Sequence, residues 1–164
     1  MLLAFALTLG CGVKTRDTTY IDPDAYGAVE GTGIEARDMR SVADVMSREL
    51  LGSPALAAFE GTPRVSVATV ENETRFLVDA EIITALITDA LVNHAAGDLA
   101  VLDGPGEADF QLRGELRSLS AATNSAQSDY VLFRFQLTDL SSNVMVWSKT
   151  YEMKKEGSWG VVYQ

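Results

Sequence analysis

Residues 109–117 read Asp-Phe-Gln-Leu-Arg-Gly-Glu-Leu-Arg, with apolar side chains at even positions and polar or charged side chains at odd positions. This alternation is typical of a β-strand that packs one face on a core and turns the other to water or a partner. The next strand repeats it at Val131, Phe133, Phe135 and Leu137. A third strand is expected over residues 144–153, after the turn at Ser141-Ser142-Asn143. Together these strands predict an antiparallel meander.

The stretch between the first two strands, residues 118–128, is long for a hairpin and rich in small polar side chains. Such a composition favours a mobile loop.

Two helices and two further strands are expected before the meander. A first helix is predicted over residues 39–51, with Asp38 as its N-cap. Residues 64–71 alternate as a strand that leads into a polar turn at Asn72-Glu73-Thr74. A second helix is capped by Asp79 and ends before Gly97, and residues 99–102 form a short buried strand. The apolar stripe of the second helix consists of Ile82, Ile83, Leu86, Ala90 and Leu91.

This order of elements predicts an α/β (α+β) fold, a layered sandwich with a central mixed, largely antiparallel sheet of four to five strands flanked by helices. A short β-α-β crossover is expected to place residues 99–102 beside residues 64–71. Residues 36–164 are expected to form a single globular domain, since a chain of 164 residues fits one domain.

Charge and composition exclude several classes of function. The chain carries 23 acidic and 13 basic residues, a formal net charge of −10, so its field repels nucleic-acid phosphates. One Cys and one His allow no internal disulfide and no zinc site. We therefore expect no cofactor, no metal site and no nucleic-acid partner.

No group of residues is expected to be catalytic, and the chain is not expected to be an enzyme. His94 falls at the end of the second helix, where a structural role is expected. It is also the only His available as a base to Ser120, Ser125 or Ser128, and no nucleophile elbow surrounds these serines.

The N-terminal apolar run, residues 1–9, is shorter than the ~20 residues of a membrane-spanning helix. It is better interpreted as the core of a signal peptide over residues 1–10. The run ends at Gly10 and Cys11, which resemble the lipobox of bacterial lipoproteins. That resemblance implies lipidation of Cys11 and, with Gly12 following it, an outer-membrane location; a buried free Cys is the alternative. Residues 11–35 are then the lipidated N-terminus and a flexible linker.

Aromatic residues near the C-terminus are candidates for partner contacts. Trp147, Tyr151 and Met153 alternate on the last strand, where burial under a helix is favoured over docking. Trp159 and Tyr163 are better candidates for a partner-binding surface, since no periodic element covers them.

Three segments of the meander carry a family resemblance: residues 108–116, residues 128–140, and Val146-Trp147-Ser148 with residues 151–157. They resemble the LpoB-type activators of penicillin-binding proteins. The resemblance implies a non-catalytic outer-membrane lipoprotein that activates a peptidoglycan synthase. The expected partner is the periplasmic part of a class A penicillin-binding protein, and no small-molecule substrate is expected. The alternative is an envelope assembly or secretion-associated structural lipoprotein with a TolB N-terminal-like fold.

Overall fold

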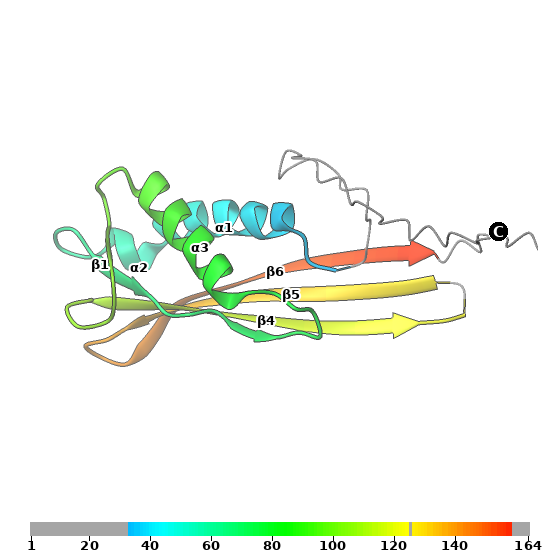
Figure 1. Cartoon of the computed structure of the whole chain (residues 1–164). Helices are drawn as coiled ribbons and strands as arrows, with labels where there is room; N and C mark the ends of the chain where they lie inside the picture. Colours follow the sequence, from blue (N-terminus) through cyan, green and yellow to red (C-terminus); the bar gives the residue numbers. More distant parts are fainter. Residues whose placement is uncertain (1–32, 125, 159–164) are drawn as a thin grey trace, which may run out of the picture.

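The computed structural model describes residues 33–124 and 126–158 (Figure 1). The expected signal peptide, Cys11, Trp159 and Tyr163 lie outside these residues, as does Ser125. The elements along the chain are α1 (Ala36–Leu51), α2 (Pro54–Ala57), β1 (Arg64–Val67), β2 (Glu71–Glu73), α3 (Ala80–Ala95), β3 (Ala100–Leu102), β4 (Phe110–Ala122), β5 (Ala126–Asp139) and β6 (Val144–Ser158).

The strands form one mixed sheet of six strands in an α+β fold, as the sequence predicted. Its order is β3-β1-β4-β5-β6, and β2 also pairs with β4. The predicted crossover is confirmed, because β1 and β3 are parallel, with Arg64 opposite Ala100. The predicted meander is confirmed in the antiparallel pairs β4–β5 and β5–β6. The strand expected over residues 64–71 is divided into β1 and β2, which raises the strand number above the expected four to five.

The helices cover one face of the sheet and leave the other uncovered (Figure 1). Helix α3 begins at the predicted cap, where the Asp79 carboxylate accepts the backbone N–H of Glu81 at 2.9 Å. Its buried row is Ile83, Ile87, Leu91 and Ala95, a spacing of four residues that keeps one side of the helix on the sheet. The prediction for Ile82 was wrong: its side chain lies one position round the helix from that row and is 54% exposed.

Helix α1 begins three residues before its predicted start, and Asp38 is not its N-cap. Glu35 takes that position, and the Asp38 carboxylate accepts the backbone N–H of Glu35 at 2.9 Å. Asp38 therefore acts from the first turn as half of a reciprocal capping box.

Two predictions about turns were also wrong. Residues 118–122 and 126–128 are strand, and the β4–β5 ladder continues to the pair Ala122 and Gln127. β6 extends this end of the sheet as far as Ser158, which lies opposite Ala126. The polar turn expected at residues 72–74 is instead strand β2 over Glu71–Glu73, because these residues pair in parallel with β4.

Candidate functional site

The uncovered face of the sheet, here called the open face, is the candidate functional site. Even-numbered residues of β4 and odd-numbered residues of β5 pack under the helices, so the opposite parity points outward. The open face consists of Gln111, Arg113, Glu115, Arg117 and Leu119 on β4, and Tyr130, Leu132, Arg134 and Gln136 on β5.

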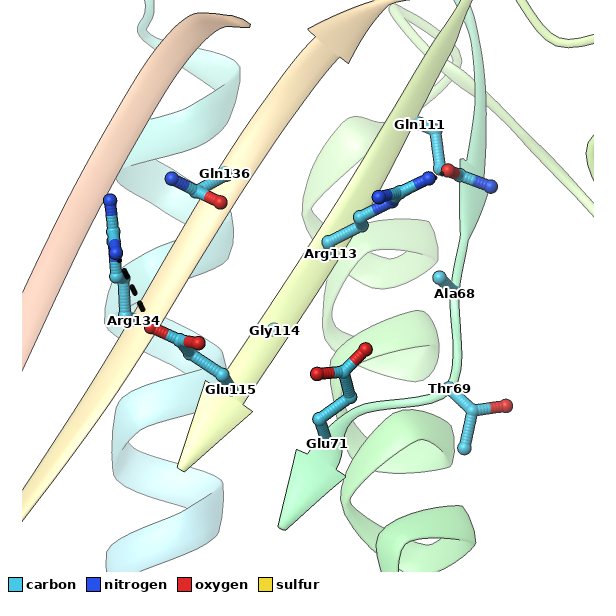
Figure 2. A pocket seen from close by; sticks show the side chains of 9 residues that line it. All are labelled: Ala68, Thr69, Glu71, Gln111, Arg113, Gly114, Glu115, Arg134 and Gln136. Carbon is cyan, nitrogen blue, oxygen red and sulfur yellow. Dashed lines mark hydrogen bonds and ion pairs between the residues drawn. The ribbon is translucent and has the colours of Figure 1, made fainter. Parts of the chain in front are cut away.

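A depression of about 430 Å³ lies in the open face beside β4 (Figure 2). It forms where the chain leaves the sheet between β1 and β2. There Val70 turns into the core, and its N–H donates to the Thr84 hydroxyl of α3 at 2.9 Å. The side chains around the hollow at this break are polar or small: Ala68, Thr69, Glu71, Gln111, Arg113, Gly114, Glu115, Arg134 and Gln136.

Charged side chains in and beside this depression form an exposed network. Glu115 lies 3.4 Å from the guanidinium of Arg134 and 3.5 Å from that of Arg117, which also pairs with Glu73 at 3.0 Å. Exposed pairs of this kind contribute little to stability, typically below about 1 kcal/mol. The network is therefore better suited to recognition than to holding the fold.

Arg113 differs from the other arginines of the open face. Its Nε donates to the Gln111 side-chain oxygen at 2.9 Å. It makes no ion pair with any residue in the described part of the chain. Figure 2 shows Arg113 beside Gln111 at the rim of the depression. Its charge is thus available to a carboxylate from outside.

The end of the open face that lies away from the depression is apolar. Leu119 of β4 lies opposite Tyr130 of β5, and Leu132 lies next along β5 on the same face. The Leu119 side chain is 72% exposed. Desolvation and the nearby Glu152 carboxylate raise the pKa of the Tyr130 phenol above its ordinary value. An exposed leucine and a tyrosine beside arginines have the composition of a protein-binding surface.

The aromatic residues predicted on the last strand lie on the covered face. Trp147, Tyr151 and Met153 are partly buried against the core, so the favoured prediction of burial is confirmed. The Tyr151 hydroxyl donates to the Glu49 carboxylate of α1 at 2.6 Å. Burial, with that carboxylate second, raises the pKa of Tyr151 far above its ordinary value.

His94 joins two helices. Its Nε2 lies 2.6 Å from the Asp44 carboxylate of α1, and this hydrogen bond is the main cause that lowers the pKa of Asp44. The Ser120 hydroxyl, one of the serines for which His94 was the only available base, donates to the Asp129 carboxylate. The structure therefore places His94 in a helix–helix contact, in line with its predicted structural role.

The described residues contain no group of three or more His, Cys, Asp or Glu side chains placed to hold a metal ion. No helix among them has the length and apolar character needed to cross a membrane.

Comparisons with known proteins agree with this architecture. Residues 104–153 match the family model described as "Peptidoglycan-synthase activator LpoB". The solved LpoB C-terminal domain from Escherichia coli is similar in fold, with a TM-score of 0.53 at 16% identity, over 71% of this chain and 98% of that chain. The domain from Salmonella enterica gives a TM-score of 0.51 at 14% identity over the same shares. A search of curated proteins finds no match. The resemblance expected from the sequence is confirmed: residues 104–153 match the LpoB activator family, and the chain has a fold similar to that of the LpoB C-terminal domain.

Proposed function

We propose that this chain is a non-catalytic regulator that binds the periplasmic part of a class A penicillin-binding protein and raises its rate of peptidoglycan synthesis. The family match over residues 104–153 carries the proposal, because the matched family is described as a peptidoglycan-synthase activator. Lipidation of Cys11 and attachment to the outer membrane are part of the same proposal.

Activation follows from selective binding. A regulator raises the activity of an enzyme when it binds the active conformation more tightly than the resting one. A lipid anchor raises the local concentration of the regulator, so a contact of micromolar affinity is sufficient. Residues 12–35 span about 80 Å when fully stretched, which sets the reach of the domain from its anchor.

The open face is the proposed docking surface. All nine of its residues lie within the stretch that matches the activator family, 104–153. Leu119 and Tyr130 offer an apolar anchor, and Arg113, which has no ion pair among the described residues, offers a cation to an acidic side chain of the synthase. This surface thus combines an apolar contact with a directional charged one.

The direct test is binding followed by activity. The purified chain is mixed with a class A penicillin-binding protein, and glycan polymerisation and cross-linking are measured with and without it. We expect binding and a rise in at least one of the two rates. Absence of binding at tens of micromolar would overturn the proposal.

Substitutions on the open face are expected to weaken this binding. Arg113→Glu and Tyr130→Ala should each raise the Kd about tenfold, equivalent to about 1.4 kcal/mol, because each removes a contact of the proposed docking surface. The matched controls lie on the helices: Arg48→Glu reverses an exposed charge on α1, and Val92→Ala truncates an exposed side chain on α3. Equal loss with the control variants would show that the docking surface lies elsewhere.

A further inference from the structure

The loop between β2 and α3 carries a leucine that the domain does not cover. The Leu77 side chain is 108% exposed, although its neighbours Phe76 and Val78 pack against the core. Single exposed leucines are common on protein surfaces, so exposure alone indicates no function. The hydrogen bonds that hold this loop distinguish Leu77 from a leucine that is exposed by chance.

The Asn72 side chain of β2 holds the loop on both sides of Leu77. Its Nδ2 donates to the carbonyl oxygens of Phe76 at 3.1 Å and of Val78 at 3.2 Å. Its Oδ1 accepts the backbone N–H of Thr74 at 3.0 Å and the Thr74 hydroxyl at 2.7 Å. An Asn side chain has two N–H donors and an oxygen with two lone pairs. Asn72 therefore uses its full hydrogen-bonding capacity on this loop.

Leu77 is the central residue of a tight turn. The Val78 N–H donates to the Phe76 carbonyl at 3.0 Å, which closes a three-residue γ-turn around Leu77. The Phe76 N–H donates to the Thr74 hydroxyl at 3.2 Å. Leu77 therefore lies at the tip of the loop, between two residues whose side chains fix the turn on the core.

The start of the loop is attached to strands β4 and β5. The Arg75 N–H donates to the Ser118 hydroxyl at 3.3 Å, and the Arg75 guanidinium pairs with the buried Asp129 carboxylate at 2.7 Å. Leu77 follows Arg75 by two residues, which is at most about 7 Å of chain. A side chain that is already held in position loses less conformational freedom on binding, and this preorganisation favours affinity.

The loop continues the open face. Glu73, the last residue of β2, pairs with Arg117 of the open face at 3.0 Å. Glu73 also lies opposite Arg117 in the parallel register of β2 and β4, so two more residues bring Arg75 level with Leu119. Leu119 belongs to the apolar end of the open face. The tip of the loop therefore adds a further apolar side chain, Leu77, next to that end.

From these observations we infer that Leu77 is an anchor that inserts into an apolar pocket of the synthase, and that Asn72 is the residue that positions it. The inference rests on the proposed function, since the partner is the same protein. The chemistry of the pocket follows from the side chain: leucine has no charge and no hydrogen-bonding group, so only an apolar pocket gains from burying it. Because the domain covers none of the Leu77 side chain, all of its apolar surface is available to the partner.

The affinity of the full chain for a purified class A penicillin-binding protein tests the anchor. Leu77→Ala should raise the Kd about tenfold. It should leave the free energy of unfolding unchanged, because the side chain is fully exposed in the free domain. The matched control Val92→Ala shortens an exposed apolar side chain on α3 and should leave the Kd unchanged.

The outcomes separate this inference from the proposed function. If the unmodified chain binds and Leu77→Ala binds equally well, the inference is overturned and the proposed function stands. If the unmodified chain does not bind, both are overturned. A change in the oligomeric state of Leu77→Ala would assign Leu77 to a contact between copies of this chain and would also overturn the inference.

A double-variant cycle tests the role of Asn72. Asn72→Asp keeps oxygen acceptors for Thr74 and removes both N–H donors to the carbonyls beside Leu77. It should raise the Kd about fivefold in the otherwise unmodified chain, because the leucine is no longer held in position. In the Leu77→Ala background it should have no further effect, since the side chain that it positions is gone. An equal rise in the Kd in both backgrounds would show that Asn72 serves only the fold and would overturn its positioning role.

Discussion

Replacement of Arg75 by alanine is expected to lower the free energy of unfolding by about 3 kcal/mol. The side chain of Asp129 is fully buried, and Nη2 of Arg75 lies 2.7 Å from each of its carboxylate oxygens. Without Arg75 the buried carboxylate loses this ion pair and keeps the hydrogen bonds that Ser120 and Gln127 donate. Removal of one partner from a buried pair costs about 3–5 kcal/mol. We expect the lower end of this range, because the Arg75 side chain is half exposed and water can partly replace it.

Chemical denaturation at neutral pH measures this effect. The matched control is Arg113→Ala on the open face, which removes an arginine with no ion pair in the described part of the chain and should change stability by less than about 0.5 kcal/mol. The double variant Arg75→Ala with Asp129→Asn should recover part of the loss, since it removes the buried negative charge together with its arginine partner. A loss below about 1 kcal/mol for Arg75→Ala would contradict the structural role given to this pair.

The same contacts explain why the prediction of a mobile loop over residues 118–128 was wrong. Small polar side chains favour an exposed loop when only the sequence is considered, yet several of these side chains have partners in the structure. Ser118 accepts the backbone N–H of Arg75 at 3.3 Å, and Ser120 and Gln127 both donate to Asp129. Arg75 precedes Asp129 by 54 residues, so no local pattern could reveal these partners.

The meander, by contrast, could be predicted, because its signal is local. Alternation over residues 109–117 placed Phe110, Leu112 and Leu116 on the covered face, where the structure has them buried. It also assigned the odd positions to water or a partner, and these positions now form part of the open face. Where apolar and polar residues alternate along a strand, the sequence alone shows which residues lie on each face of the sheet.

The depression in the open face was not predicted, although a signal for it was present. Val65 and Val70 are both buried but differ in parity, so an unbroken strand cannot turn both toward the core. The break between β1 and β2 resolves this conflict. What the sequence could not show is the acceptor for the Val70 N–H, the Thr84 hydroxyl, which a separate helix supplies.

Gly114→Ala is expected to lower the free energy of unfolding by about 2–3 kcal/mol. Gly114 lies on the covered side of β4, between Leu112 and Leu116. A Cβ atom there would lie 2.8 Å from Cε1 of Phe135 and 3.1 Å from Cγ2 of Val70. The Phe135 ring is 1% exposed, so it has little room to move, and overpacking of this kind costs about 1–3 kcal/mol.

The sign of the change makes this test decisive. Alanine in place of glycine inside a strand stabilises a protein by about 0.5–1 kcal/mol when nothing clashes. A stabilised Gly114→Ala variant in urea denaturation would therefore contradict the close approach of the Phe135 ring. The double variant Gly114→Ala with Phe135→Leu should be more stable than the sum of the two single changes predicts, because the smaller side chain removes the ring atoms nearest the new methyl group.

The same glycine connects the core to the open face. Gly114 also lines the depression, and Figure 2 shows it on β4 between the neighbours Arg113 and Glu115. A methyl group that pushes β4 away from Phe135 would move both of these charged side chains along with the strand. Gly114→Ala should therefore lower both the affinity for the synthase and the stability, whereas the double variant should recover the affinity and part of the stability. Recovery of stability without recovery of binding would show that the position of β4 at Gly114 does not control the docking surface.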